Sequence, residues 1–302
     1  MANSPIVSSL PTYVEQNRLP LIAKAVLGAK SASLFTLQSG VKGQTALNLI
    51  DTDVVFGDGS VCGWDEAGTS TLTQRVITPA YLKVNMGFCD KKLIDKWCNY
   101  QVQVAAGAKT LPFEEDFVTS ITDNVKSKLE TMVWQGDSTS QTAEEFDGIL
   151  TILEASGSGV IPKNIASGTS AYDAIKEVAS AIPNEVYGEN TVIFVGMDLF
   201  RSFIADLVTA NLYHFNPSDK DGEYILPGTA VKVIGVNGLN GTNKIVAGSL
   251  ENFFYGTDLS GDEEVYKLWY SEDNREFRLA IEFTAGVQVA YPDQIVLGTI
   301  AE

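Results

Sequence analysis

The chain has 302 residues, 45% of them hydrophobic and 20% charged, with a net charge of −17. Such a composition is ordinary for a folded protein of one large or two modest domains. The negative charge argues against a protein that binds nucleic acid by neutralising phosphates, and no apolar run reaches the roughly 18 residues that a membrane span needs. The amino terminus lacks the basic and apolar regions of a secretory signal, so we expect a soluble intracellular protein.

The first 40 or so residues are weakly periodic and carry Pro5, Pro11 and Pro20. They predict an extended arm, with one short helix near residues 19–35. Because an arm of this length has no core of its own, we expect it to lie against the rest of the molecule or against a neighbour.

Two extended segments, 44–57 and 71–87, flank the glycine-rich stretch VVFGDGSVCGWDEAG at 54–68. The second segment is rich in β-branched and aromatic residues, as strands prefer. No basic residue stands between Lys42 and Arg75. A polar, acidic segment with a glycine-rich tip has few side chains to bury in a core, so we expect it to project from the rest of the molecule.

Two helices are predicted next. The first covers the segment CDKKLIDKWCNYQVQVAAG and ends at Gly107. The second is the strongest in the chain and covers 111–135, with acidic residues in its first turn and Gly136 after its last. Its apolar residues recur at helical spacing and form one stripe: Phe117, Ile121, Val125, Leu129 and Met132.

After a loop-rich stretch at 137–170, the pattern alternates between helix and strand. Helices are predicted at 171–182 and 197–214, and strands at 191–196, 223–236 and 244–256, which together form a compact α/β unit. The tail reads as an antiparallel meander. In EFRLAIEFT, four residues share one apolar face: Phe277, Leu279, Ile281 and Phe283. The segment GVQVAYPDQIVL is predicted to supply the next strand.

No cofactor or metal site emerges from the residues. Counted from Asp58, an EF-hand loop would place Cys62 and Thr69 where oxygen-rich ligands are required. The glycines of GVNGLNGTN at 235–243 fall three apart with no helix after them, which favours a turn over a dinucleotide site. In that turn, the Asn–Gly pairs would supply positive φ angles.

Catalytic residues are equally hard to place. The single histidine, His214, has no nucleophile motif around it, and Glu114 and Glu115 are explained by the helix dipole. The cysteines Cys62, Cys89 and Cys98 form no Cys-x-x-Cys pair. We therefore expect a protein that is not an enzyme.

The order of these parts resembles the major capsid proteins of tailed bacteriophages, which have the Hong Kong 97-like fold. The resemblance rests on the arm, the acidic excursion, the long helix entered by LPFEE and left by WQGD, the following FDGIL, and the closing FTAGVQVAYPDQIVL. It implies an α+β fold with these divisions: an N-terminal arm at 1–43, an E-loop at 44–87, a peripheral (P) domain at 88–168 with its spine helix at 111–135, an axial (A) domain at 169–256, and a return of the P-domain at 257–302.

The resemblance also implies the function: a structural protein that self-assembles as hexamers and pentamers into an icosahedral shell around double-stranded DNA. Implied partners are other copies of the chain, a portal, a separate scaffolding protein and possible decoration proteins. The location is the virion, after assembly in the bacterial host cytoplasm. Because the E-loop has no lysine between Lys42 and Lys83, we expect a non-covalent shell.

Contact candidates follow from the same assignment. At the tip of the E-loop they are Asp58, Trp64, Asp65 and Glu66, of which Trp64 is the apolar anchor. Candidates for a loop near the capsomer axis are Asn237, Gly238, Asn240 and Gly241, with YHFNPSDKDGE at 213–223 as a second candidate loop.

Three alternatives stay open. An encapsulin-type nanocompartment shell would have the same fold and would enclose a cargo enzyme. An orphan soluble enzyme would stay a small monomer. A phage tail-tube protein would be mostly β structure, which fits poorly with the long helix.

Overall fold

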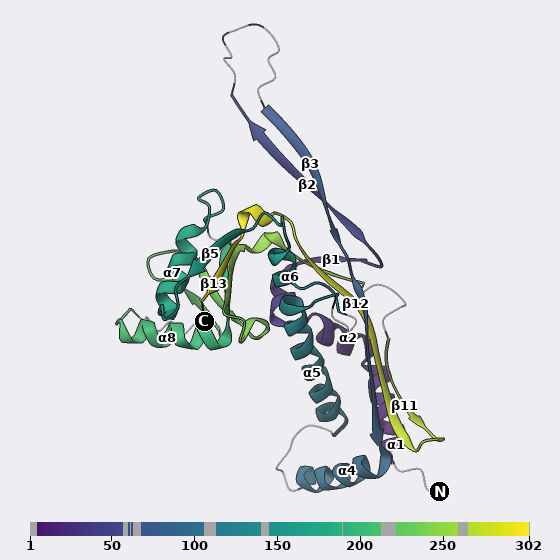
Figure 1. The fold of residues 1–302 in the computed structure, drawn as a ribbon. Coiled ribbons are helices and arrows are strands. Elements are labelled where there is room, and N and C mark those ends of the chain that lie inside the picture. The colour runs from purple at the N-terminus through teal and green to yellow at the C-terminus, as the bar shows by residue number, and fades with distance from the viewer. Residues whose placement is uncertain are drawn as a thin grey trace.

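The protein was analysed as a computed structural model that describes residues 5–56, 60, 62, 68–105, 113–139, 145–188, 190–212, 222–258 and 265–301. These residues form a five-stranded sheet, a six-stranded sheet and a separate two-stranded ribbon, with helices on both larger sheets. The ribbon projects away from the remainder of the chain, and the long helix α5 (Phe113–Gln135) runs beside the five-stranded sheet (Figure 1).

The amino-terminal segment is helical. The short helix predicted near residues 19–35 is therefore confirmed, and the extended chain predicted around it is wrong. The segment forms α1 (Pro5–Gln16), α2 (Arg18–Val26) and α3 (Lys30–Leu34). Apolar residues at helical spacing bury one side of these helices, among them Leu10, Val14, Ile22 and Val26. Pro5 opens α1, a position where the missing N–H costs nothing. The expectation that the segment lies against the rest of the molecule is confirmed, because α1 and α2 pack on α5 and on strand β11.

The projecting ribbon is the hairpin of β2 (Thr45–Val54) and β3 (Gly68–Ile77), paired antiparallel from Thr45 opposite Ile77 to Val54 opposite Gly68. The predicted second segment, 71–87, proves to be two strands in two sheets. β4 (Ala80–Cys89) follows β3 but pairs with β12 instead of β2. Pro79 lies at the break, and a residue without an N–H is unsuited to continuing a ladder.

The five-stranded sheet is built around β12 (Glu276–Val289), with the order β1-β10-β12-β11 and β4 beside β12. The other members are β1 (Thr36–Ser39), β10 (Phe253–Thr257) and β11 (Val265–Ser271). The predicted apolar face of β12 is confirmed: Phe277, Leu279, Ile281 and Phe283 are buried. The prediction of a separate strand after residue 285 is wrong, because β12 continues unbroken to Val289 along β10.

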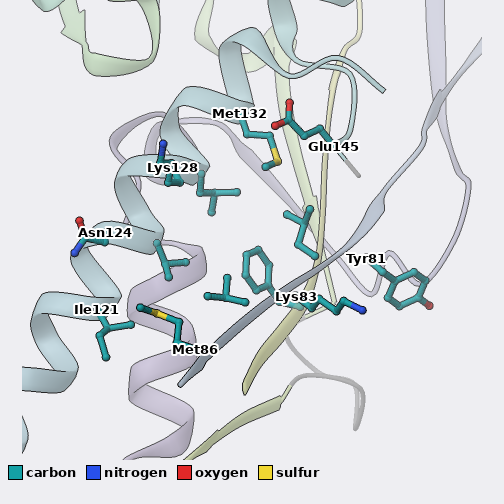
Figure 2. A pocket seen from close by; sticks show the side chains of 13 residues that line it. Tyr81, Lys83, Met86, Ile121, Asn124, Lys128, Met132 and Glu145 are labelled. Carbon is teal, nitrogen blue, oxygen red and sulfur yellow. The ribbon is translucent and has the colours of Figure 1, made fainter. Parts of the chain in front are cut away.

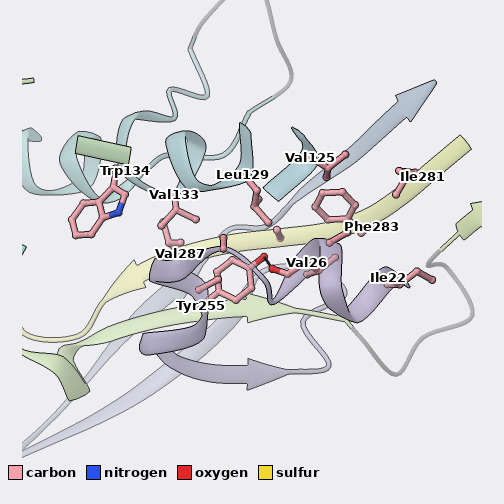
Figure 3. Close-up of a cluster of buried hydrophobic side chains, with 14 of the residues drawn as sticks. Ile22, Val26, Val125, Leu129, Val133, Trp134, Tyr255, Ile281, Phe283 and Val287 are labelled. Atoms are coloured by element: carbon pink, nitrogen blue, oxygen red, sulfur yellow. Dashed lines mark hydrogen bonds between the residues drawn. The ribbon is translucent and has the colours of Figure 1, made fainter. Parts of the chain in front are cut away.

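Three helices follow β4: α4 (Asp90–Ala105), α5 (Phe113–Gln135) and α6 (Ile149–Glu154). The long helix is confirmed, and Gly136 follows its last residue as expected. Its predicted stripe faces the sheet, and further residues bury a second stripe against α2 and α3. Figure 3 shows Val125, Leu129 and Val133 of α5 close to Val26 of α2 and to side chains of the sheet. Among the described residues, none of the helices is long and apolar enough to cross a membrane.

The six-stranded sheet has the order β5-β13-β9-β6-β8-β7. Its strands are β5 (Ile161–Ile165), β6 (Thr191–Gly196), β7 (Glu223–Ile225), β8 (Lys232–Val236), β9 (Lys244–Ser249) and β13 (Val296–Ile300). Helices α7 (Ala171–Ala181) and α8 (Met197–Thr209) pack on it over a second apolar core. Short 3₁₀ turns are η1 (Asn237–Leu239), η2 (Leu250–Asn252) and η3 (Pro292–Gln294).

The predicted domain divisions at residues 169 and 256 stay a prediction, and the two larger sheets exchange strands across them. β5 and β13 come from outside that range, yet they pair with each other and β13 pairs with β9. Conversely, β10 lies mostly inside the range but belongs to the five-stranded sheet. The order of the elements along the chain does not reveal this exchange, because β13, the last strand, lies between β5 and β9.

Candidate assembly surfaces

The hairpin β2–β3 carries apolar side chains that the described part of the chain leaves exposed. Ile50 and Leu72 lie opposite each other across the two strands, and they are 63% and 77% exposed. At the far end of β2, Val54, Val55 and Phe56 are also exposed, with Phe56 at 96%. Large apolar side chains exposed together on one projecting element are typical of a surface that contacts another molecule.

Hydrogen bonds from the end of β12 and from the residues just after it hold this hairpin near its base and at the middle of β2. The amide Nε2 of Gln288 donates to the carbonyl oxygen of Val76 at 2.6 Å. The hydroxyl of Tyr291 donates to the carbonyl oxygen of Ile50 at 3.3 Å. The two contacts reach different strands of the hairpin, so they hold its direction relative to the end of β12.

The predicted contact residues at the hairpin tip, Asp58, Trp64, Asp65 and Glu66, lie outside the described residues. Their role as contacts stays a prediction. The same holds for the second candidate loop, of which residues 213–221 are also outside the described ranges.

The turn at 237–243 contacts the long helix. Gly238 is buried against α5, and a Cβ at this position would collide with the Trp134 ring and the Glu130 carbonyl oxygen. The amide Nε2 of Gln135 donates to the Gly238 carbonyl oxygen at 2.6 Å. The expectation of positive φ holds for Gly241, at 72°, but Gly238 lies in a 3₁₀ turn and is not among the residues with positive φ.

The other half of the turn binds the start of α8. The Asn240 side-chain oxygen accepts a hydrogen bond from the Met197 backbone N–H at 2.6 Å. The Gly241 N–H donates to Asp198 Oδ2 at 2.9 Å. Asn240 therefore satisfies one of the free N–H groups at the helix start. Asn237, Asn240 and Gly241 remain exposed, and the predicted position of this loop at a capsomer axis stays a prediction.

Sequence reasoning missed a buried polar cluster that joins α3 to α5. Glu130 is 4% exposed, and its carboxylate accepts hydrogen bonds from the Ser31 N–H at 3.0 Å and the Ser31 hydroxyl at 2.5 Å. The Trp134 indole N–H donates to the same hydroxyl at 2.7 Å. Burial raises the pKa of Glu130, while the hydrogen bonds from Ser31 and the charge of Lys30 act in the opposite direction. The one local signal was a glutamate four residues before a tryptophan in the sequence of α5.

Within the described ranges, no group of three or more His, Cys, Asp or Glu side chains is placed to hold a metal ion. Two surface features stand out among the described residues: the exposed hairpin and a groove beside α5 (Figure 2).

This arrangement defines the Hong Kong 97-like fold, as expected from the sequence. No family model and no curated protein matches the sequence. Solved structures match nearly the whole chain. A satellite phage P4 procapsid that includes the size determination (Sid) protein matches with a TM-score of 0.63 and 10% identity, over 94% of this chain and 91% of that chain.

Two further matches come from other kinds of particle. The capsid of an empty GTA particle matches with a TM-score of 0.55 and 13% identity, over 92% of this chain and 90% of that one. A virus-like particle from Pyrococcus furiosus matches with a TM-score of 0.53 and 11% identity, over 93% of this chain and 97% of that one. At these identities the likeness establishes the fold of this chain.

Proposed function

We propose that the chain is the major capsid protein of a tailed phage, a structural subunit that self-assembles into an icosahedral shell. The observation that carries this proposal is the β2–β3 hairpin, which exposes Ile50, Leu72 and Phe56 on a fixed base. In a single chain these apolar side chains stay in contact with water, which is unfavourable, whereas neighbours in a closed shell would cover them. The likeness to capsid structures over about nine-tenths of both chains supports the same function.

Shell assembly suits a subunit of this kind because symmetry repeats each contact many times, so that individually modest interfaces suffice. We propose hexamers and pentamers of this chain as the building units, with a portal, a separate scaffolding protein and decoration proteins as further partners. The role is structural and not enzymatic, and the final location is the virion.

The enclosed molecule in this proposal is double-stranded DNA, held without sequence-specific contacts. The net charge of −17 supports it, because an acidic inner wall would not adhere to packaged DNA. Replacing acidic residues of the inner wall by lysine is expected to impair packaging or ejection. Unchanged packaging and ejection in those variants would refute this role of the charge.

Electron microscopy of particles purified from infected or expressing cells tests the proposal. We expect closed shells that contain nucleic acid protected from nuclease. We also expect boiled particles to run on SDS gels as a single-chain band near 32.6 kDa, because the hairpin offers no lysine for a covalent cross-link. Ladders that survive boiling would contradict the non-covalent shell.

The second candidate is the shell of a protein-filled nanocompartment. The likeness to the virus-like particle from Pyrococcus furiosus favours it. Mass spectrometry of purified particles separates the two functions: a copurified cargo enzyme in place of DNA would favour the nanocompartment.

A further inference from the structure

A carboxylate is buried without a hydrogen bond at the end of β10. The side chain of Asp258 is 2% exposed, and neither of its oxygens has a hydrogen-bond partner among the described residues. Its ion-pair partner there is Lys42, whose Nζ lies 3.8 Å from Oδ2 of Asp258. A buried charge is costly unless a counter-ion offsets the loss of its hydration. The charge of Lys42 is therefore what makes the burial of Asp258 tolerable.

Lys42 lies in the hairpin root, the two connections at residues 40–44 and 77–79 that join β2 and β3 to β1 and β4. Glycines stand on both sides of it: Gly40 has a φ of 75°, and a Cβ at Gly40 or Gly43 would meet nothing within 4 Å. Short connections with such open surroundings are where a change of backbone angles is absorbed most easily. The hairpin root therefore has the construction of a hinge.

The hairpin root rests directly on the backbone of the five-stranded sheet. Gly256 of β10 and Gly286 of β12 are partners across the two strands. A Cβ at Gly256 would lie 3.2 Å from the side chains of Val41 and Ile77, and one at Gly286 would lie 2.9 Å from the Cα of Pro79. At these two positions the sheet has no side chain that could interlock with the root.

The remaining contacts of the root are few. Its own core is small and separate from the main core, with three buried residues: Val41, Leu47 and Ile77. The hydrogen bonds from Gln288 and Tyr291 to the hairpin are exposed, so water can replace them. A cavity of about 160 Å³ lies beside the root and is lined in part by Thr78 and Pro79.

The hairpin itself is held together more firmly than it is attached. Its two strands are paired without a break from Thr45 opposite Ile77 to Val54 opposite Gly68. A ladder of this length keeps the strands together when the contacts at one end open. Movement at the root would therefore turn the hairpin as a unit.

The two members of the ion pair differ in their access to water. The side chain of Lys42 is 61% exposed, whereas Asp258 gains hydration only when the root lifts from the sheet. The backbone of Lys42 is held separately, because the Tyr81 hydroxyl donates to its carbonyl oxygen at 3.3 Å. Figure 2 shows Tyr81 of β4 pointing away from α5. The ammonium group can thus leave Asp258 while its backbone stays in place.

We propose that Lys42 and Asp258 form an electrostatic latch that sets the direction of the hairpin. While the ammonium group lies beside Asp258, the root stays on the sheet. When the ammonium group is withdrawn, the hydration of Asp258 favours lifting of the root, and the hairpin turns about residues 40–44 and 77–79. The latch is a property of the single chain, so it goes beyond the proposed shell function and stands or falls separately from it.

Distances between two spin labels test the latch in dilute, unassembled protein. One label is attached at Leu72→Cys in the hairpin and the other at Leu19→Cys in α2, both at exposed positions. The native cysteines are exposed and are replaced by serine: Cys62, Cys89 and Cys98. Pulsed electron paramagnetic resonance then reports the direction of the hairpin relative to the helices that pack on the sheet.

We expect one distance in the wild type and a second population in Lys42→Met, which leaves the buried charge without a counter-ion. Asp258→Asn and the double variant should both keep the single distance, because neither contains that charge. Lys42→Arg, which keeps the counter-ion, should also keep it. The matched control is Lys163→Met, which removes a 3.4 Å ion pair with Glu177 in which both side chains are partly exposed.

Two results would overturn the latch. One is a distance distribution of Lys42→Met that equals that of the wild type. The other is a second population that persists when Asp258→Asn is added, because the opening would then not be driven by the buried charge.

Amide exchange followed by mass spectrometry distinguishes local opening from a loss of the whole fold. In Lys42→Met, exchange should become about tenfold faster in peptides from the hairpin root and stay unchanged in peptides from α5. An equal increase in both sets of peptides would show that Lys42 supports the fold as a whole, and this outcome also contradicts the latch.

Discussion

The indole N–H of Trp134 donates a hydrogen bond of 2.7 Å to the hydroxyl of Ser31, two residues that stand 103 positions apart. The same hydroxyl donates to Glu130, so a single serine of α3 joins two residues one turn apart on α5. Trp134 also contacts Phe35 and Phe194 with ring centroids 5.9 and 5.1 Å apart, and its ring covers Gly238. The amino-terminal helices, the long helix and the six-stranded sheet therefore meet at one buried side chain.

Replacing Trp134 by phenylalanine should destabilise the subunit by about 2 kcal/mol, because it removes a buried hydrogen bond and part of the packed ring. Urea unfolding of the purified variant measures this change. The control is Trp269→Phe, since Trp269 is 36% exposed and its replacement should cost less than about 0.5 kcal/mol. Equal stabilities of the two variants would contradict the role given to Trp134.

Glu130 predicts a pH dependence of stability. Burial raises its pKa in the folded protein above the ordinary value of 4.5, so the folded state holds the proton more tightly than the unfolded state does. The stabilisation of the folded state by protonated Glu130 is therefore complete below pH 4.5 and is lost as the pH rises through the raised pKa. Glutamine at this position cannot titrate.

The measurement is the free energy of unfolding of the wild type and of Glu130→Gln across this pH range. We expect the wild-type value to fall relative to the variant as the pH rises. Asp123→Asn, on the exposed side of the same helix, serves as the control. A difference between wild type and Glu130→Gln that stays constant with pH would rule out the raised pKa.

Gly238→Ala should destabilise the fold by about 2–3 kcal/mol, because the new Cβ overlaps a buried ring and a backbone oxygen that have no room to move. Gly43→Ala provides the matched control, since a Cβ at residue 43 meets nothing within 4 Å. Thermal unfolding compares the two. A melting temperature for Gly238→Ala equal to that of Gly43→Ala would mean that the turn is free to move away from α5.

The pair Ile50→Thr and Leu72→Thr should separate assembly from folding. Both side chains are already exposed in the single chain, so we expect the free energy of unfolding to change by less than about 0.5 kcal/mol. Assembly should weaken, because the substitutions remove apolar area that neighbours would bury. Light scattering follows assembly, with Val208→Thr, an exposed position on α8, as the control. Normal assembly of the double variant would remove this pair from the contact surface.

The parts of the fold that the sequence predicts well are those with local signals. The stripe from Phe117 to Met132 defines α5, and the alternation from Phe277 to Phe283 defines the buried face of β12. The short helix predicted near residues 19–35 is confirmed by α2 and α3, whereas α1 was missed because three prolines in twenty residues suggested an extended chain. Two of them, Pro5 and Pro20, occupy first turns, where proline is tolerated.

The parts that the sequence could not predict depend on contacts between distant segments. Nothing near Gly238 indicates that α5, 103 residues earlier, passes over it. The pairing of β13 with β5 and β9 likewise joins segments far apart in the sequence, and no local pattern contains it. The exposed end of the hairpin was foreseen as a projection, but its apolar character at Val54–Phe56 became a functional feature only when the structure left those residues uncovered.

Sedimentation velocity of the purified wild-type chain over a wide range of concentrations tests the central claim most directly. The account predicts fast-sedimenting particles made of many copies, formed above a threshold concentration and visible as closed shells by electron microscopy. A single species of 32.6 kDa at every concentration would contradict it.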